Sequence, residues 1–156
     1  MTEVRFYHLT ELPLERALPG MLEKTLERGQ RAVIRGGHAE RLRFLDTHLW
    51  TYGDGSFLPH GTSADGHADL QPIWLTSGSD VPNDAKTLFL IDGAESGPDE
   101  MADMDLTAIL FDGHDPAAVD AARDQWRAVT GAGFAAVYWA QESGRWVKKH
   151  EAVAKG

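Results

Sequence analysis

Short apolar runs alternate along the chain with longer segments in which apolar residues recur every three or four positions. The short runs predict strands at 4–9, 31–35, 72–76, 87–91, 106–111 and 134–141, and three of these runs are compact enough for strands buried on both faces. The longer segments predict helices at 12–28, 38–50 and 115–133. This alternation predicts an α/β fold: a single domain with a mainly parallel twisted sheet, helices on both faces and a Rossmann-like topology.

The helix predicted for residues 115–133 has the clearest limits. Asp115 is suited to cap its N-terminus, Pro116 fits the first helical position, and Gly131 or Gly133 is suited to end it. An apolar stripe marks the face that we expect to be buried: Val119, Ala122, Trp126 and Val129.

Arg123 and Arg127 flank Trp126 along one edge of this stripe, because successive helical residues are about 100° apart. One interpretation is a solvated face on which Arg123 pairs with Asp120 and Arg127 with Asp124, while Trp126 belongs to the core. The other interpretation is a recognition surface. The residues alone favour the ion pairs, since charge pairs are common on helices.

Composition narrows the possible classes of protein. With 156 residues, 42% of them hydrophobic, the chain is large enough for one ordinary core. It has no cysteine, which excludes disulfides and thiolate metal ligands. Its net charge of −9 argues against strong direct binding to DNA or to an anionic membrane. We expect a cytoplasmic protein, because the sequence shows neither a signal-peptide pattern nor a membrane-spanning apolar run.

Candidates for catalysis are few. Gly36 and Gly37 stand between a predicted strand and a predicted helix, but neither of the common glycine-rich phosphate motifs is present. Asp92 and Asp112 each follow an apolar strand and precede a glycine, which favours turns. The same two carboxylates also support an alternative function, a nucleotide- or metal-dependent hydrolase. We expect no catalytic residue, metal or cofactor otherwise.

Several short strings follow one another in a recognisable order: Phe6-Tyr7-His8-Leu9, Leu45-Asp46, Leu49-Trp50-Thr51-Tyr52, Ser56-Phe57-Leu58-Pro59-His60, Gln71-Pro72-Ile73, Phe111-Asp112-Gly113, Ala122-Arg123, Trp126-Arg127, Gly133-Phe134 and Tyr138-Trp139. In this order they resemble the chi subunit of bacterial DNA polymerase III, a clamp-loader-associated adaptor. The resemblance covers residues 6–146. It implies one chi-like α/β domain, taken here as 1–149, followed by a flexible tail, 150–156.

The resemblance also implies a function without catalysis. Chi-family proteins link the clamp loader to single-stranded DNA-binding protein by binding its acidic C-terminal tail, which ends in a hydrophobic residue with a free carboxylate. Arg123, Trp126 and Arg127 match the family's tail-binding positions, so the recognition interpretation becomes the preferred one. Guanidinium groups beside an apolar surface suit such a ligand.

A second interface is implied for the aromatic residues near the predicted loop 51–69. Trp50 and Phe57 match positions that the family uses toward its psi subunit. The residues alone leave two possibilities open, a cover for the core or an exposed patch that anchors a partner. The expected partner is psi, another clamp-loader component or a helicase.

Overall fold

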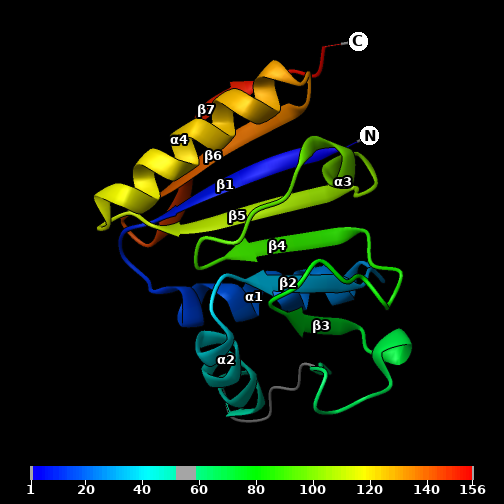
Figure 1. Ribbon diagram of the computed structural model, residues 1–156. Coiled ribbons are helices and arrows are strands. Elements are labelled where there is room, and N and C mark those ends of the chain that lie inside the picture. The colour runs from blue at the N-terminus through cyan, green and yellow to red at the C-terminus, as the bar shows by residue number, and fades with distance from the viewer. Residues whose placement is uncertain (1, 52–58, 156) are drawn as a thin grey trace.

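The computed structural model describes residues 2–51 and 59–155, with only the backbone for residues 50 and 51 (Figure 1). Its centre is a seven-stranded sheet in the order β3-β2-β4-β5-β1-β6-β7. The strands are β1 (Glu3–Leu9), β2 (Ala32–Gly36), β3 (Ile73–Thr76), β4 (Thr87–Ile91), β5 (Leu106–Asp112), β6 (Ala135–Glu142) and β7 (Arg145–Ala152). Neighbouring strands are parallel except for β6 and β7. The predicted α/β class and mainly parallel sheet are confirmed, whereas this strand order does not confirm the Rossmann-like topology.

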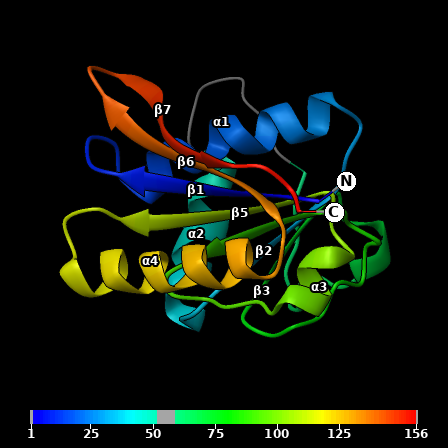
Figure 2. The ribbon, with the colours of Figure 1, turned by 90° about the horizontal axis from the view of Figure 1, so that it is seen from above.

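Helices cover both faces of the sheet, as the alternation predicted. They are α1 (Leu14–Glu27), α2 (Ala39–Thr51), α3 (Pro98–Ala102) and α4 (Pro116–Gly131), and a short 3-10 turn, η1 (Ala68–Leu70), precedes β3. Figure 2 shows α1 and α4 on opposite sides of the sheet. None of the described helices is both long and apolar enough to cross a membrane.

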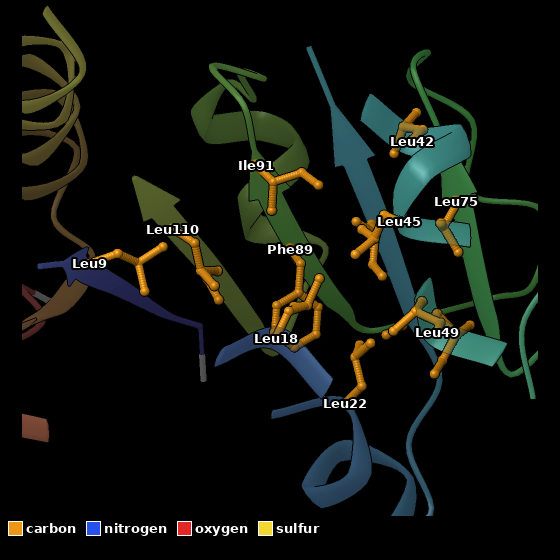
Figure 3. Close-up of a cluster of buried hydrophobic side chains, with 14 residues drawn as sticks. Leu9, Leu18, Leu22, Leu42, Leu45, Leu49, Leu75, Phe89, Ile91 and Leu110 are labelled. Carbon is orange, nitrogen blue, oxygen red and sulfur yellow. The ribbon is translucent and has the colours of Figure 1, made fainter. Parts of the chain in front are cut away.

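Each face of the sheet has its own hydrophobic cluster. One face buries leucines from α1 and α2 (Figure 3): Leu18, Leu22, Leu42, Leu45 and Leu49. The other face buries side chains from α3 and α4: Met101, Ala122 and Val129. Strand residues supply both clusters, because successive side chains point to opposite faces, so Phe89 packs in the first cluster and Leu88 in the second.

Helix α4 has the limits that its sequence predicted. The Asp115 side chain accepts a hydrogen bond from the backbone N–H of Ala117 at 3.0 Å, which caps the N-terminus, and Pro116 is the first helical residue. The helix ends at Gly131, and Gly133 adopts a φ of 92°, a left-handed conformation that favours glycine. The caps fix where α4 begins and ends on the sheet.

The C-terminal end of the chain differs from the expected flexible tail. Residues 150–152 form the end of β7, where His150 pairs with Tyr138 and Ala152 with Ala136. Beyond the strand, the backbone N–H of Lys155 donates a hydrogen bond to the carbonyl of Gly133 at 2.9 Å. A register shift between Tyr138 and Trp139 interrupts the pairing, so β7 does not show a regular alternation in its sequence.

Candidate functional site

Helix α4 has two edges with different chemistry. Ala122 and Val129 face the sheet and are buried. The 100° spacing places Arg123, Trp126 and Arg127 on one side of this buried line, here called the basic edge. The other side carries the exposed residues Ala117, Ala121 and Ala128, here called the alanine edge.

The basic edge faces the hairpin formed by β6 and β7. The Trp126 ring lies 6.1 Å from the ring of Tyr138 on β6 and 6.4 Å from that of His150 on β7. Tyr138 and His150 also contact each other, with ring centroids 5.8 Å apart. Figure 1 shows α4 crossing in front of these two strands. The rings of Trp126, Tyr138 and His150 thus form one aromatic surface beside the two arginines.

Trp126 has a buried side and an accessible side. Its ring meets Phe6, a fully buried residue of β1, edge-on at 5.4 Å and an interplanar angle of 62°. This arrangement is favourable for two aromatic rings. The residue as a whole is only partly buried. Trp126 is therefore anchored in the core and still presents surface to solvent.

A histidine holds the Tyr138 side chain in place. Its hydroxyl group forms a hydrogen bond with His8 Nδ1 at 2.9 Å, and the His8 ring stacks on Phe111 at 5.0 Å. Burial raises the pKa of Tyr138, while the nearby charge of Arg123 acts in the opposite direction and is the smaller effect. The phenol therefore stays neutral at physiological pH, and Arg123 is close enough for its charge to act on the phenol group.

Gly113 is needed beneath the same cluster. A Cβ at this position would collide with the His8 ring and would also crowd the methyl group of Thr10. The backbone N–H of Gly113 donates to the carbonyl of Leu9 at 2.7 Å. The loop after β5 thus approaches the end of β1 closely, and three strings that carry the family resemblance, at 6–9, 111–113 and 138–139, meet under α4.

Both arginines of the basic edge form the ion pairs that the sequence predicted. Arg123 Nη1 lies 3.7 Å from Asp120 Oδ1, and Arg127 Nη1 lies 3.1 Å from Asp124 Oδ1. The two arginine side chains remain 65% and 74% exposed. Exposed pairs of this kind contribute only about 0.3–0.5 kcal/mol on a helix. A ligand that offers better carboxylate geometry has little to displace.

The two side chains of the second predicted interface lie outside the part of the chain that the structure describes. Trp50 belongs to the last turn of α2, but its side chain and the whole of Phe57 lie outside the description. The chain next to them is well anchored. His60 is buried, and its Nε2 lies 3.1 Å from the backbone carbonyl of Asp46 on α2. Two further strings of the resemblance, 45–46 and 56–60, are joined by this contact.

A cleft of about 1120 Å³ lies along the alanine edge and not at the basic edge. Its lining includes Ala117, Ala121 and Ala128 of α4, and residues 9–15 after β1. The side chains of Arg123, Trp126 and Arg127 do not line it. This cleft is therefore separate from the cations and aromatic rings of the basic edge.

Asp92 and Asp112 both line this cleft, and each is also part of a turn. Asp92 adopts a φ of 49° in a turn closed by a 3.0 Å hydrogen bond from the N–H of Ala94 to the carbonyl of Ile91. The Asp112 side chain accepts a hydrogen bond from the N–H of His114 at 2.9 Å. The turn interpretation is confirmed for both. Among residues 2–51 and 59–155, no group of three or more His, Asp or Glu side chains is placed to hold a metal ion.

Gly37, the second glycine of the pair at the end of β2, has a packing role. A Cβ on Gly37 would collide with the backbone carbonyl oxygen of Asp92. Gly37 also donates its N–H to the carbonyl of Ile91 at 3.2 Å. The absence of a side chain thus allows the turns after β2 and β4 to touch.

Comparison with known proteins identifies the family. The model of the DNA polymerase III chi subunit, HolC, matches residues 1–137. The chain belongs to the DNA polymerase III chi subunit family. This confirms the resemblance found in its sequence, and it associates the chain with an accessory subunit of the polymerase and with DNA replication. The matched region contains α4 and ends within β6, so Tyr138 and all of β7 lie beyond it.

One curated relative supports the same family. The probable DNA polymerase III subunit chi of Rickettsia prowazekii (strain Madrid E) is 30% identical over 91 residues. The alignment covers 58% of this chain and 55% of the relative, so the chain spans about half of the length of that protein.

Sequence reasoning missed several residues of the site. Tyr138 and His8 lie in apolar runs and gave no sign of their contact, because β1 and β6 are about 130 positions apart in the chain. His150 belongs to the predicted tail, 150–156, whereas the structure places it in β7. The one available signal was the pair Ser143 and Gly144, which forms a two-residue hairpin turn with φ values of 52° and 75°.

Proposed function

We propose that this chain is a non-catalytic replisome adaptor that links the clamp loader of DNA polymerase III to single-stranded DNA-binding protein. The proposed ligand is the acidic C-terminal tail of that protein. The observation that carries the proposal is the basic edge of α4, where two exposed arginines flank a partly buried tryptophan. In a chain with a net charge of −9, such a surface is unusual and suits an anionic partner.

The proposed mechanism is binding alone. Arg123 and Arg127 receive the carboxylates of the tail, because a guanidinium group donates two parallel hydrogen bonds to one carboxylate. The accessible side of Trp126 receives the terminal hydrophobic side chain. Asp120 and Asp124 hold the arginines until the tail arrives and are then displaced. Thr130, one turn beyond Trp126, donates its hydroxyl to the carbonyl of Trp126 at 2.7 Å.

The second proposed interface is the region of Trp50 and Phe57, with psi, another clamp-loader component or a helicase as its partner. Its support is the family resemblance at these two positions. Copurification of the Trp50→Ala protein with clamp-loader components tests it. Loss of the clamp loader with retained tail binding is the expected result, and unchanged copurification would exclude Trp50 from this interface.

Calorimetric titration with an acidic peptide ending in Phe tests the main proposal. We expect a Kd near 1 μM, which corresponds to about −8 kcal/mol, and weaker binding at high salt. Removal of the terminal Phe from the peptide, or the Arg123→Ala substitution in the protein, should abolish measurable heat. A folded wild-type protein that does not bind this peptide would overturn the proposal.

The alternative function, a nucleotide- or metal-dependent hydrolase, rests on the presence of Asp92 and Asp112 in one cleft. It requires a nucleotide with Mg²⁺ to bind the folded state and so to raise the melting temperature. We expect no shift, since the Asp112 carboxylate accepts a hydrogen bond within its turn and the Asp92 carboxylate lies 3.4 Å from Arg41. A rise of several degrees at millimolar nucleotide would favour the hydrolase over the adaptor.

A further inference from the structure

Some side chains of strand β7 lie on the same face of the sheet as the aromatic surface of the candidate site. Cross-strand partners lie on the same face, and residues two apart on a strand also share it. Tyr138, Ala140 and Glu142 therefore define one face of β6. Their partners on β7 are His150, Val147 and Arg145. These three residues form a row that continues outward from the basic edge of α4.

The row has the chemistry that an acidic tail requires. His150 is exposed and places its ring against both Trp126 and Tyr138. Val147 is partly buried and apolar. Arg145 is exposed at the tip of the hairpin and makes no ion pair with any described residue. An aromatic ring, an apolar side chain and an unpaired cation thus follow one another in a line.

The hairpin is held in place before any ligand arrives. Gln141 Oε1 accepts hydrogen bonds from the backbone N–H groups of Thr10, Glu11 and Leu12 at 2.9, 2.8 and 3.1 Å. In return, the Glu11 carboxylate accepts from the N–H groups of Ser143 and Gly144 at 2.8 and 2.9 Å. These five bonds tie the turn of the hairpin to the loop after β1, so the row is part of a fixed surface.

We infer that β7 is the second wall of the tail-binding surface, with His150 contacting the terminal side chain of the tail and Arg145 pairing with an acidic residue upstream. This inference rests on the proposed function. Glu142 lies four positions after Tyr138, which at about 3.4 Å per residue is roughly 14 Å. An extended tail rises by the same amount, so the partner of Arg145 is an acidic residue about four positions before the terminal residue.

The row on β7 lies beyond the region that the family model matches. The match ends at residue 137, so His150, Val147 and Arg145 lie outside the part of the chain that the family model matches. Helix α4 lies within the matched region, so the site would combine residues inside that region with residues beyond it. With Arg145 at a fixed distance from His150, the β7 wall selects for a tail that carries an acidic residue at a defined position, and not merely for an acidic tail.

A double-mutant cycle between protein and peptide tests the charge pair. The peptides end in Phe and carry either Asp or Asn four positions earlier. We expect Arg145→Ala to weaken binding of the Asp peptide roughly three- to fivefold, as for an exposed ion pair. The Asn peptide should bind the wild-type protein as weakly as the Asp peptide binds the Arg145→Ala protein. Its affinity should not fall further when Arg145 is replaced by Ala. Additive losses would overturn the pairing.

The role of His150 is tested on the same titration. His150→Ala should weaken binding by roughly three- to tenfold, the range for one aromatic contact, and His150→Phe should restore it. Lys148→Ala is the matched control, because Lys148 lies on the same strand, pairs with Trp139 on the opposite face and forms its ion pair with Glu151. Melting temperatures establish that each variant is folded.

Two outcomes separate this inference from the function on which it rests. If Arg127→Ala abolishes binding while Arg145→Ala and His150→Ala bind like wild type, the adaptor function stands and the β7 wall is wrong. If wild type itself does not bind the Phe-terminated peptide, the proposed function fails and the β7 wall fails with it.

Discussion

The two edges of α4 differ in almost every property that matters for binding. The basic edge has cations and accessible aromatic rings and does not line the cleft of about 1120 Å³, whereas the alanine edge lines this cleft but has no cation of its own. Carboxylates also gather around that cleft: Glu11, Glu15, Asp92, Glu95, Asp112, Asp115 and Asp124. A single arginine, Arg41, lines it, and this arginine lies 3.4 Å from Asp92. The volume of a cleft therefore does not identify the binding site for an acidic tail, since the carboxylates around this cleft would repel such a tail.

The largest expected effect comes from removing the tryptophan of the basic edge. Trp126→Ala should lower the free energy of unfolding by about 3 kcal/mol, because the indole packs on buried Phe6, and should abolish tail binding. Chemical denaturation and peptide titration measure the two effects. Trp126→Phe is the control, with most of the stability retained. Tail binding by a folded Trp126→Ala protein would exclude the basic edge as the site.

A methyl group under the basic edge should have the next largest effect. Gly113→Ala drives a Cβ into the His8 ring, which supports Tyr138 through its hydrogen bond. We expect a loss of about 2 kcal/mol in unfolding free energy, typical of overpacking, and weaker tail binding. Gly97→Ala, where an added Cβ meets nothing within 4 Å, is the matched control. Equal stability of the two variants would contradict the close packing described for Gly113.

Reversing one charge on each edge compares them directly. Arg127→Glu should weaken tail binding at least tenfold, which corresponds to about 1.4 kcal/mol for a lost charge-assisted contact and a new repulsion. Ala121→Glu introduces the same side chain on the alanine edge of the same helix and should change the Kd less than twofold. Titration of both proteins with one peptide decides the matter. A larger effect from Ala121→Glu would move the site to the cleft.

The smallest expected effect comes from releasing an arginine. Asp124→Asn removes the acceptor that lies 3.1 Å from Arg127. We expect unfolding free energy to change by less than about 0.5 kcal/mol, as for other exposed pairs. Tail binding should tighten about twofold, because Arg127 no longer exchanges one carboxylate for another. Weaker binding would instead mean that Asp124 orients the guanidinium group for the ligand.

Sequence reasoning was most successful where a feature is local. The limits of α4, the ion pairs at a spacing of three and the strand-forming runs depend on neighbours within about one helical turn or one strand. The family followed from the order of short strings and is confirmed. These features need no knowledge of how distant segments meet.

The remaining features of the site depend on contacts between distant segments. His8 and Tyr138 meet because β1 pairs with β6, and no pattern in either strand encodes that partner. The extent of β7 was hidden by its register shift and by its charged residues, which suit an exposed edge strand as well as a tail. His150 became part of the aromatic surface only once that strand was in place.

The central position of β1 has a consequence for the order of folding during synthesis. Its two neighbours, β5 and β6, begin about 100 and 130 residues later in the chain. At roughly 5–20 residues per second, translation needs on the order of 5–20 s to reach the first of them. Throughout that interval Val4 and Phe6, which are fully enclosed in the finished molecule, have no strand beside them. The strand of this sheet that is synthesised first is thus among the last to be enclosed, and until then its apolar side chains and unpaired edges are exposed to aggregation.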